Sequence, residues 1–173
     1  LVVLCQLERV LLGPLLTLLL ADGSTLVVQT SSGRLKGFID AAHPNFRAFR
    51  GIPYAKPPVK NLRWRLPQPF GRWEGTRNAT QFGSTCIQNA GGGWATVEGV
   101  RNASEDCLTL HVSFSEKRAS PSPPLRPVLV WLHGGGLLEG SSFAIQSGFE
   151  AVGTHLPGML DALVVGVEYR LGV

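Results

Sequence analysis

Apolar and polar positions follow strand-like patterns over most of the chain. Residues 26–30 and 34–38 are rich in β-forming residues and are separated by the small, polar residues 31–33, a pattern typical of a β-hairpin. Residues 46–52 and 107–112 alternate between apolar and polar side chains, which predicts two further strands. The pattern therefore predicts an N-terminal hairpin followed by single strands.

Two continuous apolar runs, residues 128–132 and 163–167, have the length of strands. A strand that is apolar on both faces is expected to be buried on both faces, as in a parallel sheet covered by helices. Residues 143–160 between the runs predict a short helix, limited by two glycines and a proline. Residues 120–127 are a proline-rich connection within one sheet. These elements together predict the α/β fold class.

Composition narrows the class of protein further. The chain has 173 residues, of which 44% are hydrophobic and 16% charged, so it is long and apolar enough for one globular domain. This balance argues against a disordered or fibrous protein.

The charge is concentrated in one stretch. Between Arg34 and Arg77 the chain has ten lysines and arginines but only two acids, Asp40 and Glu74, within an overall net charge of +4. A nucleic-acid or anionic-lipid surface is one interpretation. Prolines and apolar residues interrupt the cations, which favours ordinary solvated or ion-paired side chains. We therefore expect no nucleic-acid partner.

The cysteines and sequons indicate an oxidising compartment. Cys5 lies in an apolar N-terminal stretch, which leaves Cys86 and Cys107 as the expected pair. Closing such a loop of about twenty residues would stabilise the fold by ~3 kcal/mol in the loop-entropy model. Asn78 and Asn102 each begin an N-glycosylation sequon in the same region. Together these features predict a secreted or secretory-lumen glycoprotein.

The N-terminus has the pattern of a signal peptide. Arg9 precedes an apolar run over residues 11–21, and the small residues Ala21 and Gly23 stand at the two positions that a signal peptidase reads. The run is too short to cross a bilayer comfortably, so no stable membrane span is expected. An N-terminal core segment is the alternative. The favoured interpretation is a leader at residues 1–23 and one domain at residues 24–173.

The strongest chemical signal follows the first apolar run, where His133 is followed by Gly134, Gly135 and Gly136. Consecutive glycines allow positive φ angles and a close approach of the backbone to a ligand. Such a loop can direct N–H groups at an oxyanion that forms during acyl transfer. A strand followed by this tetrapeptide is typical of the oxyanion loop of lipases and esterases. A plain glycine-rich turn is the alternative.

Four further segments occur in a fixed order around this loop. The chain contains Gly51-Ile52-Pro53-Tyr54-Ala55-Lys56-Pro57-Pro58, Ser104-Glu105-Asp106-Cys107-Leu108, Gly140-Ser141-Ser142 and Tyr169-Arg170-Leu171-Gly172. From about residue 27 to residue 173, the sequence resembles the carboxylesterase type B and cholinesterase-like family. The resemblance implies the N-terminal portion of an α/β-hydrolase fold: a β-hairpin and the first strands of a central, mostly parallel sheet.

The resemblance also implies roles for individual residues. The N–H groups of Gly135 and Gly136 correspond to two donors of the family's oxyanion hole, with His133 and Gly134 as supporting residues. Cys86 and Cys107 correspond to the family's disulfide. In addition, Arg63 and Glu105 correspond to a structural ion pair.

The activity implied by the resemblance is hydrolysis of small-molecule or lipid carboxylic esters through an acyl-serine intermediate, without cofactor or metal. No Gly-x-Ser-x-Gly elbow occurs before Val173. We therefore expect these residues alone to lack the nucleophile, acid and base, to be inactive and to be poorly soluble. A cholinesterase-like adhesion module without catalysis is the alternative, although the three intact glycines favour an enzyme.

The chain departs from the family pattern at a few positions. Leu137 stands where an aromatic residue commonly follows the glycines, and His111 stands where a small polar residue is expected. Ser113 replaces an apolar residue, and Trp94 does not match the spacing of the cholinesterase cation-binding tryptophan. These departures indicate a divergent member of the same family.

Overall fold

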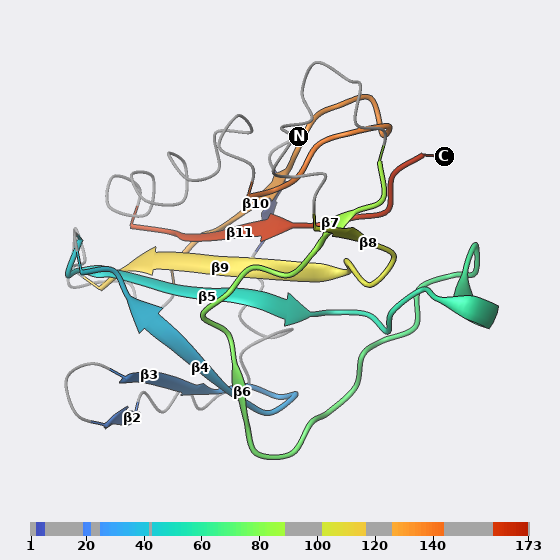
Figure 1. Cartoon of the computed structure of the whole chain (residues 1–173). Helices are drawn as coiled ribbons and strands as arrows, with labels where there is room; N and C mark the ends of the chain where they lie inside the picture. Colours follow the sequence, from blue (N-terminus) through green and yellow to red (C-terminus); the bar gives the residue numbers. More distant parts are fainter. Residues whose placement is uncertain are drawn as a thin grey trace.

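The computed structural model describes residues 3–5, 19–21, 25–41, 43–88, 102–116, 126–143 and 161–172 (Figure 1). Within this part of the chain, nine strands form one sheet in the order β1-β10-β11-β9-β5-β4-β3-β2, with β6 paired to β4. A separate pair, β7 and β8, lies beside the end of the sheet. The described elements are β1 (Val3–Cys5), β2 (Leu19–Ala21), β3 (Thr25–Gln29), β4 (Arg34–Ile39), β5 (Phe46–Pro53), the 3₁₀ turn η2 (Lys60–Leu62), β6 (Thr76–Asn78), β7 (Thr85–Cys86), β8 (Ala103–Ser104), β9 (Thr109–Ser115), β10 (Val128–Leu132) and β11 (Leu163–Val167).

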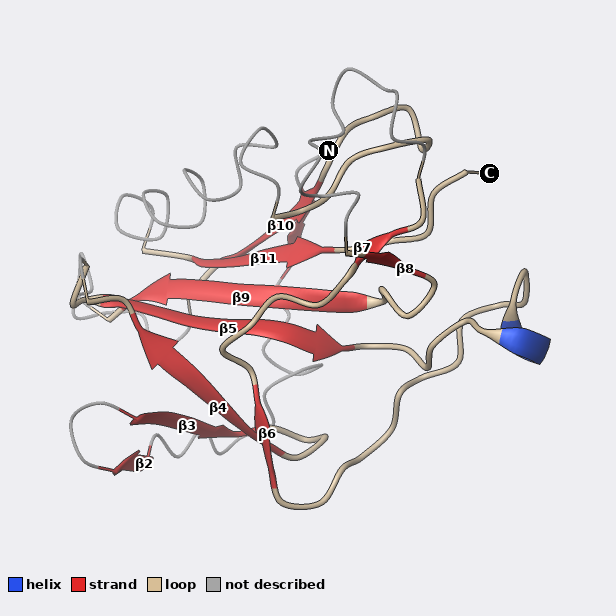
Figure 2. Cartoon of the chain, in the orientation of Figure 1, coloured by secondary structure: helices blue, strands red, loops and turns tan. Residues whose placement is uncertain are grey.

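The middle of the sheet brings together strands that are distant in sequence (Figure 2). β9 pairs antiparallel with β5 on one side and with β11 on the other, so that Val112 lies opposite both Phe49 and Val165. β11 then pairs parallel with β10, with Val130 opposite Val165. The parallel pairing predicted for the two apolar runs is therefore confirmed.

The N-terminal hairpin is also confirmed. β3 and β4 pair antiparallel, and the backbones of Thr30 and Gly33 close the turn between them with reciprocal N–H to C=O bonds of 2.9 and 3.3 Å. The alternation along β4 buries Leu35 and exposes Arg34 and Lys36, because successive side chains of a strand point to opposite faces.

Three apolar clusters form the described core. One lies between the hairpin and β5, one surrounds the disulfide, and one joins β9, β10 and β11. Full burial of a large aliphatic or aromatic side chain contributes about 1.5–3 kcal/mol. The clusters consist of Leu26, Val28, Leu35, Phe49 and Ala79; of Ala55, Cys86, Cys107, Leu108 and Leu171; and of Leu110, Val128 and Val165.

Burial of the two apolar strands differs from the sequence-based expectation. The centre of β11 is buried, with Val164 fully inaccessible, but β10 is only half-buried and Leu132 is 39% exposed. The burial expected on both faces of β10 is therefore not reached among the described residues. Among the described residues the only helical element is η2, so no described helix covers this strand. The helix predicted over residues 143–160 lies outside the described residues, apart from residue 143.

Several details were not predicted. The short strands β6, β7 and β8 carry no clear alternation, and the strand predicted at residues 107–112 is shifted to Thr109–Ser115. The backbones of β1 and β2 pair with β10 and β3. Within the described residues, no helix has the length and apolar character needed to cross a membrane.

The basic stretch forms contacts within the fold. Arg47 forms an ion pair with Glu116, and the guanidinium of Arg50 lies over the rings of Phe38 and Phe82 at 4.5 and 4.2 Å from their centroids. These cations are used in packing, which supports the interpretation as ordinary paired side chains.

Candidate functional site

The glycine loop, defined here as residues 133–140, leaves the carboxyl end of β10. Gly135 has a φ of +115°, and a Cβ atom placed there would lie 1.9 Å from the carbonyl oxygen of Glu139. The Gly135 carbonyl accepts hydrogen bonds from the N–H groups of Leu138 at 3.0 Å and Glu139 at 3.2 Å. The tight turn therefore requires glycine at this position, because any side chain would collide with the backbone.

The backbone conformation of the loop leaves donors available. Gly136 and Leu137 also have positive φ angles, +62° and +64°. Within the described part of the chain, the N–H groups of Gly135 and Gly136 donate no hydrogen bond. Two adjacent N–H groups with no acceptor among the described residues are suited to binding an oxyanion.

His133 is held inside the structure at the start of the loop. It is buried, and its ring stacks on Tyr169 with centroids 4.2 Å apart. Nδ1 lies 2.8 Å from the carbonyl oxygen of Gly134. A Cβ atom at Gly140 would lie 2.4 Å from the same Nδ1, so the end of the loop packs directly on the imidazole. These contacts indicate a structural role for His133.

Two residues that sequence reasoning missed hold the end of the loop. The carboxamide of Gln88 accepts a hydrogen bond from the Gly140 N–H at 2.8 Å and donates to the Gly140 carbonyl at 2.9 Å. The buried carboxylate of Glu168 accepts bonds from Ser141 Oγ at 3.0 Å and from the Ser142 N–H. In the sequence, these two residues are marked only by their neighbours. Gln88 lies two residues after Cys86, and Glu168 directly precedes Tyr169.

Burial determines the electrostatics around Glu168. Desolvation raises the pKa of the Glu168 carboxyl above its usual range, while hydrogen bonds from Ser142 and Ser141 act in the opposite direction. The Tyr54 hydroxyl donates to the Glu168 carbonyl at 2.7 Å, and burial together with the neighbouring carboxylate raises the pKa of Tyr54 to about 12. Tyr54 is therefore a protonated donor at physiological pH.

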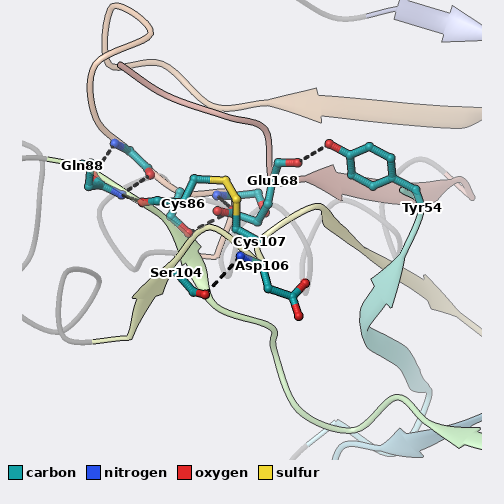
Figure 3. The surroundings of a disulfide bond; sticks show 10 residues. Tyr54, Cys86, Gln88, Ser104, Asp106, Cys107 and Glu168 are labelled. Carbon is teal, nitrogen blue, oxygen red and sulfur yellow. Dashed lines mark hydrogen bonds between the residues drawn. A yellow bond between two sulfur atoms is a disulfide. The ribbon is translucent and has the colours of Figure 1, made fainter. Parts of the chain in front are cut away.

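The predicted disulfide is confirmed. Cys86 and Cys107 are bonded, with their Cα atoms 5.0 Å apart and both side chains buried (Figure 3). Parallel pairing of β7 with β8 places Cys86 opposite Ser104, next to the Glu105-Asp106-Cys107 segment. The disulfide therefore lies immediately beside the residues that contact the glycine loop.

Arg63 and Glu105 form a salt bridge through two hydrogen bonds. Nη2 of Arg63 donates to Oε2 of Glu105 at 2.6 Å, and Nε donates to Oε1. The hydrogen bonds from Arg63 lower the pKa of the Glu105 carboxyl. The Arg63 side chain is 55% exposed, so the pair is accessible to solvent.

A hollow of about 880 Å³ separates this salt bridge from the glycine loop. Gly135 and Leu138 line it from the loop, and Ile87 and Trp64 line it from other segments. Among the described residues, no group of three or more His, Cys, Asp or Glu side chains is placed to hold a metal ion.

The remaining residues singled out in the sequence lie elsewhere. Asn78 and Asn102 are exposed, as glycan acceptors must be, and Asn78 Oδ1 accepts a hydrogen bond from the Thr80 N–H at 3.2 Å. His111 is buried against Phe82 and Phe143, with ring centroids 4.6 and 5.4 Å away. Trp94 lies outside the described residues.

The sheet order, with a glycine loop after a strand that pairs in parallel, defines the N-terminal part of an α/β-hydrolase fold. A profile of the carboxylesterase family matches residues 24–173. The chain belongs to this family, which confirms the resemblance drawn from its motifs.

Individual relatives agree with this assignment. The chain is 34% identical to a cholinesterase of Mus musculus, covering 84% of this chain and 24% of that protein. It is 33% identical to a medium-chain fatty acyl-CoA hydrolase precursor of Anas platyrhynchos, covering 92% and 31%. The crystal structure of a Geobacillus stearothermophilus carboxylesterase at pH 6.2 superimposes with a TM-score of 0.67 at 35% identity, covering 85% and 26%. The chain thus spans about a quarter to a third of the length of these relatives.

Proposed function

We propose that this chain supplies the oxyanion-hole loop of a serine-dependent carboxylic ester hydrolase. The observation that supports the proposal is the pair of N–H groups at Gly135 and Gly136, which donate to no other described residue. The tight turn at Gly135, burial of His133 and the hydrogen bonds at Gly140 hold these donors in place. Such pre-organised donors stabilise charge at no reorganisation cost during the reaction.

The proposed chemistry is two-step acyl transfer. The catalytic base takes the proton of the serine hydroxyl as the serine oxygen attacks the ester carbonyl. The negative charge moves to the carbonyl oxygen, which the N–H groups of Gly135 and Gly136 then bind. When the tetrahedral intermediate collapses, the carbon–oxygen bond to the alcohol breaks, and the alcohol leaves with a proton from the catalytic base. Water then attacks the acyl-serine in the same way and releases the acid. We propose that the serine, base and acid are supplied by residues other than these 173.

The proposed substrates are small-molecule or lipid esters. The hollow beside the loop is lined by apolar side chains including Leu138, Ile87 and Trp64, which suit the hydrocarbon part of an ester. Relatives of this chain are named cholinesterase, fatty acyl-CoA hydrolase and phenmedipham hydrolase, so members of the family are named for very different substrates. No nucleic-acid partner is proposed.

We also propose that the protein is made in the secretory pathway. The disulfide at Cys86–Cys107 and the exposed sequons at Asn78 and Asn102 support this location. Residues 1–23 would then be a leader, and the family domain would begin at residue 24, where the family profile also begins.

A direct test uses the full-length protein that contains this chain. It should hydrolyse p-nitrophenyl esters, and a fluorophosphonate probe should label one serine and abolish activity. Replacement of that serine by alanine should remove both signals while leaving the thermal unfolding temperature nearly unchanged. A folded full-length protein that neither reacts with the probe nor cleaves any ester would favour the adhesion-module alternative.

A further inference from the structure

We propose that Gln88 is a positioning residue that sets the geometry of the glycine loop and couples it to the disulfide. The inference rests on the proposed function, because it assigns a catalytic consequence to the shape of that loop. Gln88 lies near the disulfide, on the side of Cys86, and its carboxamide forms hydrogen bonds to the Cys86 carbonyl and to the N–H and carbonyl groups of Gly140 (Figure 3).

The contacts made by Gln88 involve its entire functional group. Oε1 accepts from the Gly140 N–H at 2.8 Å, and Nε2 donates to the Gly140 carbonyl at 2.9 Å and to the Cys86 carbonyl at 3.2 Å. One amide therefore satisfies the donor and the acceptor of a single backbone residue, as a neighbouring strand would. Gln88 and Gly140 are 52 residues apart in the sequence, so the contact between them is tertiary and not a local turn.

Gly140 transmits this constraint to the donors of the loop. Its φ is +117°, and a Cβ atom there would lie 2.5 Å from the Gly134 carbonyl oxygen and 2.4 Å from His133 Nδ1. The two ends of the loop therefore touch at Gly140. A shift of the Gly140 backbone must move Gly134 and, through the following peptide bonds, the N–H groups of Gly135 and Gly136.

The other end of the contact is anchored by the disulfide. Cys86 is bonded to Cys107, and the backbone of Cys107 leads directly into β9, the strand at the centre of the sheet. Gln88 follows Cys86 by two residues and also bonds to its carbonyl. The disulfide thus fixes the segment from which Gln88 reaches the loop.

Only glutamine has the length and chemistry that this contact uses. Asparagine is one methylene shorter, alanine leaves both Gly140 groups without the partner described here, and glutamate lacks both donors. Glutamate would also place acceptors against the carbonyls of Gly140 and Cys86, which Nε2 contacts at 2.9 and 3.2 Å.

The first experiment compares Gln88→Ala and Gln88→Glu with the matched control Gln68→Ala in the full-length protein. Gln68 is exposed, and among the described residues its side chain accepts one hydrogen bond, from Lys56 Nζ at 3.4 Å. We expect Gln88→Ala to lower kcat about 10- to 100-fold, because small misplacement of oxyanion donors is costly, and to change KM by less than about 2-fold. Gln88→Glu should be at least as impaired, whereas the control should match the wild type.

A second readout separates positioning from simple destabilisation. A trifluoromethyl ketone, which forms a tetrahedral oxyanion on the nucleophile, should lose affinity in Gln88→Ala by the same factor as kcat/KM. If Gln88 only stabilised the fold, the unfolding temperature would fall but kcat per fluorophosphonate-labelled serine would stay at the wild-type value. That outcome, or equal kcat in Gln88→Ala and Gln68→Ala, would overturn the inference.

A third measurement remains informative even if the proposed function fails. In Gln88→Ala, and in the double variant Cys86→Ala/Cys107→Ala, amide hydrogen exchange of residues 133–140 should accelerate at least 10-fold, while β5 stays protected. Wild-type protein that does not react with the serine probe would disprove the esterase proposal, yet accelerated exchange would still support the contact. Unchanged exchange in both variants would refute the coupling, whatever the activity.

Discussion

The phenol ring of Tyr169 lies flat on the imidazole of His133, with ring centroids 4.2 Å apart and planes inclined by 11°. The Tyr169 hydroxyl also donates a hydrogen bond to the His133 carbonyl, so one side chain holds both the ring and the backbone at the start of the glycine loop. The Tyr169 hydroxyl is a protonated donor at neutral pH, and burial raises its pKa further above the usual value.

Replacement of Tyr169 should separate these two contacts. Tyr169→Phe keeps the ring stack and removes the hydrogen bond, so we expect a loss of about 0.5–1.5 kcal/mol in the free energy of unfolding. Tyr169→Ala removes both contacts and should cost more. Urea unfolding of the full-length protein measures the difference, and an equal loss in both variants would show that the stack contributes nothing.

Gly135→Ala tests the backbone of the loop. A methyl group there collides with the Glu139 carbonyl at 1.9 Å, so the turn must change shape and activity should fall by about 100-fold or more. Gly75→Ala is the matched control, since Gly75 also has a positive φ, +70°, but no atom lies within 4 Å of its added Cβ. Ester hydrolysis at saturating substrate is the measurement. Comparable losses of activity in Gly135→Ala and Gly75→Ala would show that the effect comes from general backbone strain and not from the shape of the glycine loop.

His111 should make the fold sensitive to acid. Burial and the nearby Arg50 lower the pKa of His111 to about 3, well below its usual value of 6.5. Between these values the unfolded chain binds a proton that the folded chain does not, so stability is lost as the pH falls below 6.5. The expected slope is about 1.4 kcal/mol per pH unit.

The variant His111→Asn removes this titration and retains a side-chain acceptor near the Gly51 N–H, which donates to His111 Nδ1 at 3.2 Å. Denaturant unfolding at pH 7, 6 and 5 should show a flatter decline for the variant than for the wild type. The variant His43→Asn serves as the control, because His43 is exposed. Parallel pH profiles for the wild type and His111→Asn would contradict the assignment.

Glu105→Gln tests the salt bridge with Arg63. The lowered pKa of Glu105 means that the carboxylate stabilises the fold above its unfolded pKa, and that this contribution is lost as the pH falls through the folded value. Because Arg63 is 55% exposed, we expect a small effect that shrinks further in high salt, unlike that of a buried pair. Thermal unfolding of the wild type and the variant at pH 7 and pH 3, with and without 0.5 M salt, provides the comparison.

Secretion should leave three marks on the protein. We expect the mature chain to begin near residue 24. A glycosidase should remove glycans from Asn78 and Asn102 and so lower the mass of the protein. Thiol reagents should not label Cys86 or Cys107, because both are in the disulfide. Asn78→Gln and Asn102→Gln should each remove one glycan. Mass spectrometry of protein secreted from animal cells tests all three marks, and an unprocessed N-terminus would show that residues 1–23 remain in the chain.

The hairpin, the two apolar runs and the disulfide could be predicted because each depends on local pattern or on a motif. Residues 26–38 contain their own turn, and Cys107 lies within the Glu-Asp-Cys-Leu motif. The composition of β10 does not by itself determine how far the strand is buried, since burial depends on which elements cover a strand.

The supports of the glycine loop could not be predicted either. Gln88 and Glu168 act through contacts with residues 52 and 26–27 positions away. No periodicity marks a single polar residue whose partner lies elsewhere in the fold. The buried Glu168 follows an apolar strand and reads from sequence as a polar residue at the surface. Only the folded arrangement shows that it holds Ser141 and Ser142.

The strand order has a consequence for synthesis on the ribosome. β9 is made before β10, yet β11 occupies the place beside β9, and β10 lies beyond it. The nascent chain must therefore keep β10 away from the open edge of β9 until Val167 has emerged, an interval of about 2–7 s at ~5–20 residues per second. During this time the apolar strand β10 lacks β11, the strand that separates it from β9 in the finished sheet. Chaperone binding to residues 128–132 during translation would protect the nascent chain from mispairing.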